Sequence, residues 1–497
     1  MVWLVPRRLG AGRGGAKATA PGRGRMTAPN VLLVLTDQQR PDTLGLRAQT
    51  PCKTPNIDRI AAEGISFDNA FTPCPLCLPA RAALFTGRYP TQNGMMSNQS
   101  GRLRSCEMLE AFRQAGYQVN YAGKWHMGEG NIGAFTDRHA GDSTEDYSRW
   151  CRDQGLIDGW MFNDPATRTH RTPSMSVPRV HLQDLPVDKT NEAYITSFAI
   201  DMIRTRALDQ PFFQVVSYNG PHPPFMIPEP YFSMYDPGQV EIPSNFGPQP
   251  GEHGVHARSY YRRLFEDHGE DFDAWRASYA VYWGFVTMID DFVGGLLGAL
   301  EDEGLTDDTI VLFASDHGEM LGAHGLWHKM VAFEESIRVP LILRLPGGPG
   351  GVRATAQASL VDIAPTLSAL CGVCGPDWQG RDLIAGDLDT PDRPAVFAMH
   401  RPLGDWMHTA DWRMIRADGF KYVWHREMGH ELFDLSADPG EGVNLAAAPA
   451  HHARLTALRA ELGAFLEQTA DPLLPDWKRD RGDAGSGTDA TPPAGGS

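Results

Sequence analysis

A cysteine at the start of a short predicted helix is the residue of this chain best suited to unusual chemistry. Cys77 stands in the string PLCLPARAALFTGR, residues 75–88. Pro79 suits a first helical turn, because its missing N–H and its fixed φ cost nothing there. Unpaired amide groups and the helix dipole then favour an anion beside Cys77. For Cys-x-Pro alone a buried structural cysteine is the stronger interpretation, so a functional role for Cys77 depends on the longer string.

Acidic and polar residues follow two predicted strands at the points where the strands end. Asp37 and Gln38 come directly after the apolar string NVLLVLT, and Asp316 and His317 come directly after IVLFAS. Open α/β sheets bind ligands at the carboxyl ends of their strands, so these side chains are expected to face one cavity. Unpaired carboxylates there would repel each other, and a divalent cation relieves that repulsion. The alternative for each aspartate is a helix cap or a turn residue.

Basic residues recur at comparable places. Lys124 and His126 lie in the string GYQVNYAGKWHMG, which includes another predicted strand. A lysine there can hold a negative nucleophile, and a histidine can move a proton near neutral pH. His222 lies between prolines that hold its backbone rigid, and Lys329 lies in the loop after Asp316. Taken singly, a solvated lysine and a structural histidine are the alternatives.

Two of these strings resemble the signatures of the formylglycine-dependent sulfatases, a family within the alkaline phosphatase superfamily. One is CxPAR followed by AxLxTGR, and the other is GKWH. The resemblance spans nearly all of residues 30–445, including the strings ELFDL and DPGE near its end. It implies that Cys77 is oxidised to formylglycine, whose hydrate is the nucleophile. It also implies that a maturation enzyme recognises Pro79 and Arg81.

The resemblance further implies a metal site formed by Asp37, Gln38, Asp316, His317 and the modified Cys77. The commonest pattern of the family has Asp-Asp at the first pair and Asp-Asn at the second, so this chain departs from it. Calcium is the metal that the family implies. Because Gln38 removes a negative charge and His317 adds an imidazole nitrogen, manganese or another transition ion is the alternative.

The implied activity is hydrolysis of a sulfate monoester to an alcohol and inorganic sulfate by covalent catalysis. One hydroxyl of the hydrated aldehyde attacks sulfur, and Lys329 or His222 protonates the departing oxygen. His126 then takes the proton of the second hydroxyl, which expels sulfate and restores the aldehyde. Arg81, Lys124 and Lys329 would stabilise the charge on the transferring group together with the cation.

The elements that must position these residues alternate between strands and helices. That order predicts an α/β fold whose mostly parallel sheet has helices on both faces, and the resemblance makes it alkaline-phosphatase-like. Shorter alternation towards the C-terminus predicts a small antiparallel sheet with a closing helix. The predicted units are a disordered or upstream extension over 1–29, a catalytic domain over 30–375, the small sheet and helix over 376–475, and a disordered tail over 476–497.

Two local predictions are specific enough to check residue by residue. Thr54 is expected to cap a helix that starts at Pro55. Residues 339–345 are expected to form a buried strand of the mostly parallel sheet.

Charge and length exclude some classes of protein. The 497 residues carry a formal net charge of -16, which argues against nonspecific binding to nucleic acid or to an anionic membrane. The chain has no run of about 18 apolar residues, so no transmembrane helix is expected. Residues 1–25 have no apolar segment long enough for a secretion signal. A cytoplasmic location is therefore expected, and Met26 is an alternative start of the protein.

The seven cysteines are few for a chain of this length, and their number is odd, so a disulfide framework is not expected. The pairs Cys74/Cys77 and Cys371/Cys374 are far apart in the chain and have no histidine at zinc-finger spacing. Packing is the favoured interpretation of the second pair.

Two other functions stay open at this stage. A phosphonate monoester or phosphodiester hydrolase of the same superfamily shares the CxPAR string, but that group tends to carry tyrosine and threonine where Lys124 and His126 stand. A non-catalytic binder of sulfated glycans, or a chain never matured at Cys77, would keep the pocket without turnover.

The expected partners are a small-molecule or saccharide sulfate ester and the maturation enzyme. The ester's alcohol, whether aryl, sugar or alkyl, is not specified, and 129–188 and 220–270 are expected to shape its pocket together with the C-terminal sheet. A homo-oligomer is an open option.

Overall fold

The computed structural model describes residues 28–480 except 129, 142–143, 157–179, 250–253, 268–270, 387, 389–394, 403 and 405–409. Most of the extension predicted over 1–29 and of the tail predicted over 476–497 lies outside these residues. Residues 476–480, expected to be disordered, belong instead to the last helix (Leu474–Asp480), which buries Trp477. Its strands and helices are β1 (Asn30–Thr36), α1 (Pro55–Ala62), β2 (Ile65–Phe71), α2 (Cys77–Thr86), α3 (Pro90–Asn93), α4 (Glu107–Gln114), β3 (Gln118–Gly123), β4 (Arg138–Ala140), α5 (Thr144–Asp153), β5 (Val180–Leu182), α6 (Asn191–Arg204), β6 (Phe212–Ser217), β7 (Phe225–Ile227), α7 (Gly254–Ala257), α8 (Tyr260–Glu266), α9 (Phe272–Asp302), β8 (Thr309–Ser315), α10 (Glu334–Ile337), β9 (Leu341–Arg344), β10 (Val352–Ser359), α11 (Ile363–Cys371), β11 (Ala395–His400), β12 (Trp412–Ala417), β13 (Phe420–His425), β14 (Gly429–Asp434), α12 (His452–Gln468) and α13 (Leu474–Asp480).

The centre of the molecule is an eight-stranded sheet in the order β10-β2-β9-β8-β1-β6-β3-β4. Its pairs are parallel except those of β9, which runs antiparallel to both β2 and β8. The predicted mostly parallel α/β sheet is therefore confirmed. Within the predicted buried strand 339–345, residues Leu341–Arg344 form β9, which is buried as expected. It runs antiparallel to both neighbours, because the chain from β8 to β9 has only the four-residue helix α10 and makes no crossover to the other end of the sheet.

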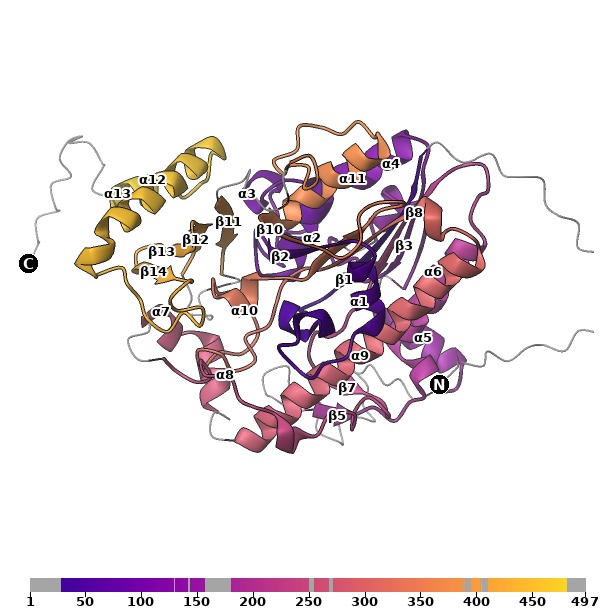
Figure 1. Ribbon diagram of the computed structural model, residues 1–497, viewed down its shortest axis with the longest axis horizontal. Coiled ribbons are helices and arrows are strands. Elements are labelled where there is room, and N and C mark those ends of the chain that lie inside the picture. Colours follow the sequence, from indigo (N-terminus) through magenta and orange to yellow (C-terminus); the bar gives the residue numbers. More distant parts are fainter. Residues whose placement is uncertain are drawn as a thin grey trace, which may run out of the picture.

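Helices cover both faces of this sheet. In Figure 1, α4 and α11 lie above the sheet, and α6 and α9 lie below it. Alternate residues of β1 enter the two resulting cores, with Leu32 and Val34 in one and Val31, Leu33 and Leu35 in the other. A strand buried on both faces explains why its sequence is continuously apolar.

The long helix α9 belongs to the core below the sheet. It has 31 residues, and its most apolar window has a mean hydropathy of 1.3, long and apolar enough to cross a membrane by those criteria alone. However, 72% of that window is buried inside the fold, where α9 packs against α1 and α6. We therefore describe it as a core helix.

The cap of α1 differs from the prediction. The Thr54 hydroxyl donates to Asp58 at 2.9 Å and makes no capping bond to α1. Instead, the carboxylate of Asp290, inside α9, accepts hydrogen bonds from the backbone N–H groups of Asn56 and Ile57 at 3.1 and 2.7 Å. A tertiary contact thus satisfies amide groups that the sequence assigned to a local cap.

The C-terminal strands form a separate antiparallel sheet in the order β11-β12-β13-β14, with α12 and α13 beside it (Figure 1). This sheet makes hydrogen bonds to the loop that follows β8. Lys421 on β13 donates to the Ala332 carbonyl at 2.7 Å and lies 3.0 Å from Glu334. The indole N–H of Trp412 donates to the Met330 carbonyl at 3.0 Å. The predicted small sheet therefore supports the loop that carries Lys329.

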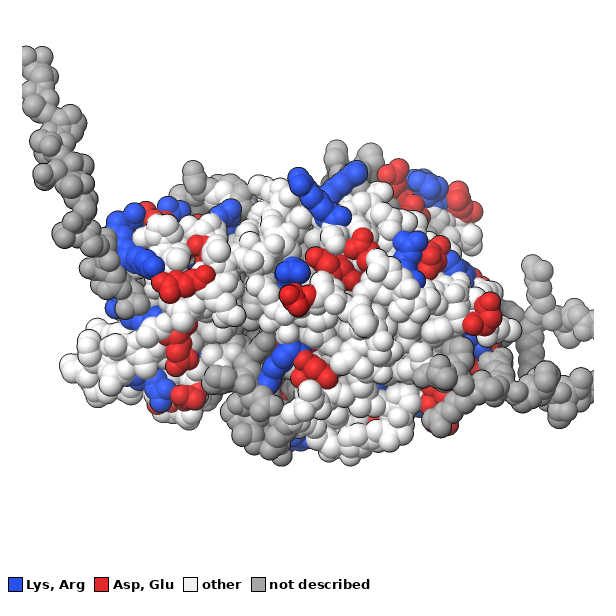
Figure 2. Space-filling view, turned by 90° about the horizontal axis from the view of Figure 1, so that it is seen from above, with Lys and Arg blue, Asp and Glu red and all other residues white. Residues whose placement is uncertain are grey.

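Charged side chains of both signs lie side by side in small groups on the face shown in Figure 2. The cations expected to meet an anionic ligand are mostly hidden instead. Arg81 is completely buried and Lys329 is 4% exposed, while the Lys124 side chain is 16% exposed. The negative net charge of the chain is therefore compatible with a positive interior site.

Candidate active site

Four of the predicted residues meet at the carboxyl edge of the central sheet. Asp37 follows β1, Asp316 and His317 follow β8, and Cys77 is the first residue of α2. All four are buried, and their candidate ligand atoms lie within 4.8 Å of one another. The Cys77 Sγ atom lies 3.2 Å from His317 Nε2 and 3.7 Å from Asp37 Oδ1.

Strand register explains why residues so far apart in sequence meet here. β1 and β8 are parallel neighbours in which Thr36 pairs with Ser315, so the residues that follow leave the sheet together. The backbone N–H of Asp316 donates to the Thr36 carbonyl at 3.2 Å, which continues the pairing by one residue. Both carboxylates consequently face the same space.

Arg81 lies one helical turn after Cys77 and binds the carboxylates of both Asp37 and Asp316. Its Nε donates to Asp316 at 2.9 Å and its Nη2 to Asp37 at 3.3 Å. Its Nη1 donates to the Ser217 hydroxyl at 2.7 Å and to the Lys124 carbonyl. These bonds use four of the five guanidinium N–H groups, so Arg81 holds both carboxylates in position. Its contact with the transferring group stays a prediction.

Lys124 and His126 follow β3 at the same edge. The Lys124 ammonium donates to Asp37, and this neighbour raises the lysine pKa despite burial. His126 is exposed and has a left-handed φ of 55°. Burial raises the pKa of the Cys77 thiol, but the positive charges of Lys329, Lys124 and His317 hold that pKa well below its ordinary value.

The loop after β8 brings Lys329 to His222. Lys329 Nζ lies 2.8 Å from His222 Nε2, and His222 Nδ1 lies 2.6 Å from the Pro223 carbonyl, to which it donates. That tautomer leaves Nε2 to accept from the ammonium. Burial first, and then Lys329, lower the pKa of His222, which keeps the imidazole neutral.

Gln38 points to a different set of partners from the other proposed metal ligands. Its side-chain oxygen accepts from Lys329, and its side-chain amide donates to Glu319. Only its backbone N–H reaches the acidic pair, donating to Asp316 at 3.1 Å. Its role as a metal ligand stays a prediction.

The sequence analysis did not single out Glu319, Ser217 or Asn98. Glu319 is completely buried and accepts three hydrogen bonds. Burial raises its pKa to about 7, while these bonds and the Lys329 charge favour the ionised form. The Asn98 carbonyl oxygen accepts from the N–H of Leu78 at 3.1 Å, at the start of α2. Glu319 lies two residues after His317, but a single buried glutamate has no periodic signal.

A metal ion fits the donor set of the first group. Two carboxylates and one imidazole converge there, and the N–H at Nδ1 of His317 donates to the Gly318 carbonyl at 3.0 Å, so Nε2 presents its lone pair to the group. Burial raises the pKa of Asp316 and the nearby Asp37 carboxylate raises it further, which is the repulsion that a cation would relieve.

A second group, His256, His425 and Glu431, is also capable of holding a metal by composition. Its carboxylate lies 3.2 Å from His256 Nε2 and 2.7 Å from His425 Nε2. These are hydrogen-bond distances, and they tie α7 to the hairpin of β13 and β14. Neither Cys371 nor Cys374 belongs to a metal-capable group among the residues that the structure describes.

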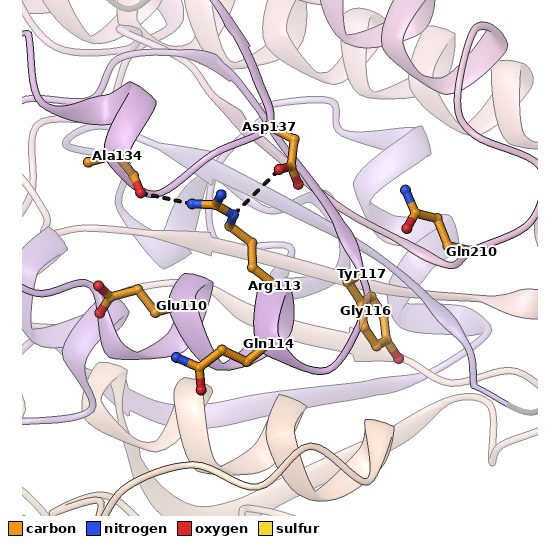
Figure 3. Close-up of a pocket in the computed structure, with 8 residues that line it drawn as sticks. All are labelled: Glu110, Arg113, Gln114, Gly116, Tyr117, Ala134, Asp137 and Gln210. Atoms are coloured by element: carbon orange, nitrogen blue, oxygen red, sulfur yellow. Dashed lines mark hydrogen bonds and ion pairs between the residues drawn. The ribbon is translucent and has the colours of Figure 1, made fainter.

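Figure 3 shows a surface pocket of about 500 Å³ beside α4 and the start of β3. Arg113 donates there to the Ala134 carbonyl at 2.8 Å and lies 3.4 Å from Asp137. Because the pocket adjoins the amino-terminal end of β3, it lies at the opposite end of the strands from Cys77 and forms no part of this site.

Comparison with known families agrees with this geometry. The family model described as sulfatase matches residues 29–373, which is more than half of the chain. The chain belongs to the sulfatase family. A second model, described as the C-terminal part of N-sulphoglucosamine sulphohydrolase, matches residues 322–468 of this sulfatase. The predicted family, its fold and its activity as a hydrolase of sulfate esters are confirmed.

Individual relatives cover most of the chain. The sulfatase is 31% identical to an ulvan-active sulfatase of Formosa agariphila over 90% of this chain and 82% of that protein. It is 30% identical to an arylsulfatase of Clostridium perfringens over 88% of this chain and 94% of that protein. Among solved structures, a phosphonate monoester hydrolase of Agrobacterium radiobacter is similar with a TM-score of 0.75 and 25% identity, covering 89% of this chain and 96% of the other.

Proposed function

We propose that this sulfatase cleaves a sulfate monoester with formylglycine formed from Cys77 and with one divalent metal. The observation that supports the proposal is the position of Cys77 at the start of α2, within 4.8 Å of the donor atoms of Asp37, Asp316 and His317. The low pKa of its thiol reports a site that stabilises negative charge at this side chain.

The metal would be held by Asp37, Asp316, His317 and an oxygen of the modified residue 77. Calcium is our first choice because carboxylate oxygens predominate, and manganese is the alternative because one donor is an imidazole nitrogen. When bound, the cation supplies positive charge to the nucleophile and to a sulfate oxygen.

The modified residue supplies two hydroxyls, one to attack sulfur and one whose deprotonation releases sulfate. Lys124 and Lys329 place positive charge around the transferring group. Lys329 gives a proton to the departing alcohol oxygen, and neutral His222 holds the ammonium in place through its Nε2. Exposed His126 accepts the proton of the second hydroxyl. The new bond from residue 77 to sulfur forms as the S–O bond to the alcohol breaks, and the proton lost by the attacking hydroxyl balances the one that Lys329 gives up. Release of sulfate then breaks the C–O bond of residue 77 and restores the aldehyde, which adds one water to become the hydrate again.

Maturation would have to precede folding. Arg81 is part of the motif expected to be recognised, yet its side chain is completely buried and bonded to Asp37 and Asp316. A maturation enzyme therefore meets this motif in a chain that has not yet folded.

Peptide mass and metal content test the proposal together. Formylglycine at position 77 makes the peptide about 18 Da lighter, because one oxygen replaces a sulfur and two hydrogens. Activity should require this mass, should be lost in Cys77→Ala and on chelation, and should return with calcium or manganese. Cys371→Ala is the matched control for loss of a thiol. Full activity after chelation together with full activity of Cys77→Ala would refute the mechanism.

The sulfated alcohol is tested by a panel of substrates. Relatives named arylsulfatase, choline-sulfatase and N-acetylglucosamine-6-O-sulfatase support small-molecule and saccharide esters as the first classes to try. Within each class, aryl, alkyl or sugar sulfates that span a range of leaving-group pKa should separate recognition of the alcohol from its reactivity. Cytoplasmic location and homo-oligomer formation stay predictions.

A phosphonate monoester or phosphodiester hydrolase is the second candidate. The similarity to the Agrobacterium radiobacter enzyme supports it, as does 29% identity to a multifunctional alkaline phosphatase superfamily protein of Trinickia caryophylli. Lys124 and His126 favour sulfate. Matched aryl sulfate and aryl phosphonate esters compare the two directly, and a higher kcat/KM for the phosphonate would reverse the order.

A further inference from the structure

Three buried donor side chains meet where α7 lies beside the C-terminal sheet (Figure 1). They are His256 on α7, His425 at the end of β13 and Glu431 on β14, and they are 3%, 1% and 2% exposed. One nitrogen of each imidazole and one carboxylate oxygen lie within 4.8 Å of one another. This group shares no residue with the group around Cys77.

The hairpin of β13 and β14 places two of the donors on one face. The strands are antiparallel, and Val423 lies opposite Glu431. His425 comes two residues after Val423, so its side chain projects from the same face as a diagonal neighbour of Glu431. His430 lies on the other face, opposite Trp424. Strand pairing therefore brings two donors together, and α7 adds the third.

Both imidazoles turn the same ring nitrogen towards the carboxylate. His256 Nε2 lies 3.2 Å from each Glu431 oxygen, and His425 Nε2 lies 2.7 Å from Oε2. The two rings are nearly perpendicular, at 85°, with their centroids 5.6 Å apart. Two ligand atoms at about 2.1 Å from a tetrahedral ion are about 3.4 Å apart. The His256 distances are close to this separation, and the His425 distance needs to widen by less than about 1 Å.

The donor types favour a transition metal. Imidazole nitrogens suit zinc and its neighbours, whereas calcium prefers six to eight oxygen ligands. Three protein donors leave one position of a tetrahedron for water. In the absence of an ion the same atoms are hydrogen-bond partners, and an ion takes the place of the protons that those bonds use.

We propose that His256, His425 and Glu431 bind a zinc ion, or another transition dication of similar size, that fastens α7 to the C-terminal sheet. The burial of all three donors favours a structural role for the ion. The inference does not depend on the reaction assigned to Cys77.

The ion would also stabilise a segment that supports the loop after β8. Three residues beyond His256, the Ser259 hydroxyl caps α8 by accepting from the N–H of Arg262 at 3.2 Å. The Arg262 guanidinium in turn donates to the carbonyls of His324 and Gly325 at 2.7 and 2.8 Å. Those carbonyls belong to the loop after β8, so the ion would link the C-terminal sheet, α7 and that loop.

The zinc content of the full-length protein tests the site. Protein freed of metal with a chelator is reloaded with zinc, desalted and analysed for metal and for protein. The wild type should hold one equivalent more than Glu431→Gln, which keeps the volume and an acceptor oxygen but loses the anionic ligand. The affinity for this equivalent should fall by more than about 100-fold, the upper end of the effect of losing an outer-shell partner.

Matched variants separate metal binding from a general effect on folding. His425→Gln should lose the same equivalent as Glu431→Gln, so the result does not depend on one substitution. His430→Gln changes a histidine on the opposite face of the same hairpin and should keep it. Zinc should raise the melting temperature of the metal-free wild type and of His430→Gln more than that of Glu431→Gln, because a ligand of the folded chain stabilises it.

Variants of the other group distinguish this inference from the proposed function. Asp316→Asn and Cys77→Ala should retain the equivalent held by Glu431, because they leave its three donors unchanged. These measurements need no turnover, so they stand even if residue 77 is not modified or the substrate is not a sulfate ester.

Two results would overturn the proposal. One is that folded Glu431→Gln and His425→Gln hold as much zinc as the wild type. The other is that Asp316→Asn, with the three donors intact, takes up no zinc. Either result would leave His256, His425 and Glu431 as a hydrogen-bonded cluster only.

Discussion

The charge on Lys124 provides the sharpest test of how this site handles an anion. Its side chain is 16% exposed and its ammonium donates to Asp37. Replacement by glutamine removes the positive charge but keeps an N–H donor. The Asp37 carboxylate still receives Arg81 at 3.3 Å, so the variant is expected to fold.

The expected loss follows from the position of this ammonium beside Cys77. Removing one donor that stabilises charge in a transition state costs about 10²–10³ in kcat, or about 2.7–4 kcal/mol. Lys124→Gln should therefore lower kcat/KM for an aryl sulfate by this factor. Because Asp37 is completely buried, removal of one of its two cationic partners should lower folding stability by up to about 3–5 kcal/mol, and Arg81 and the glutamine N–H reduce that cost.

Steady-state kinetics and thermal melting measure the two effects separately. Peptide mass at position 77 and metal content must equal those of the wild type, so that neither maturation nor metal binding accounts for the change. Lys478→Gln is the control, because that exposed lysine pairs with Glu467 far from the site in sequence, on α13 and α12. A kcat/KM for Lys124→Gln within about tenfold of wild type, with modification and metal intact, would refute the reasoning.

Three other outcomes follow from the same structure. In His126→Gln, transfer of the sulfate group to residue 77 should stay fast while release of sulfate becomes slow. Stopped-flow kinetics should therefore show a burst of about one equivalent of alcohol, followed by turnover about 10²–10⁴ times slower than in the wild type. A linear time course at the wild-type rate would contradict this expectation. Asp316→Asn should leave purified protein with substoichiometric metal by elemental analysis, since one of two anionic donors is neutralised; full metal content would count against the assigned ligands. Burial, and then Arg413, lower the pKa of His400 to about 3 from an ordinary 6.5, so the unfolded chain binds a proton that the folded chain excludes as pH falls below 6.5. His400→Leu should therefore reduce the acid-induced loss of stability by about 2 kcal/mol at pH 5, measured by denaturant unfolding at pH 5 and pH 8; an equal loss in both proteins would show that His400 does not carry it.

Local patterns in the sequence were enough to locate most of the candidate site. Asp37 and Asp316 could be placed together because each follows an apolar string, and parallel strands end at one edge of a sheet. Cys77 could be placed at a helix start because of the proline two residues later. The structure has all three at one point, with His317 beside them. Their roles in metal binding and catalysis stay predictions that the experiments above address.

Partners that depend on long-range contacts could not be predicted. Glu319 and Lys329 reach Gln38 across 281 and 291 residues. No periodicity records such a contact, because it depends on how a loop folds back over the sheet edge. The same holds for Asp290, which replaces the expected Thr54 cap of α1 from inside another helix.

The sequence by itself therefore determined the family, the mostly parallel sheet and the residue types that gather at its carboxyl edge. These follow from short strings and from the alternation of strands and helices, which are local properties of the chain. Only the tertiary structure decided that Arg81 braces two carboxylates, that Gln38 faces Lys329 rather than those carboxylates, and that β9 runs antiparallel. In each case a buried polar side chain or a strand takes the orientation that satisfies its hydrogen bonds. Partners that are far away in the sequence determine that orientation.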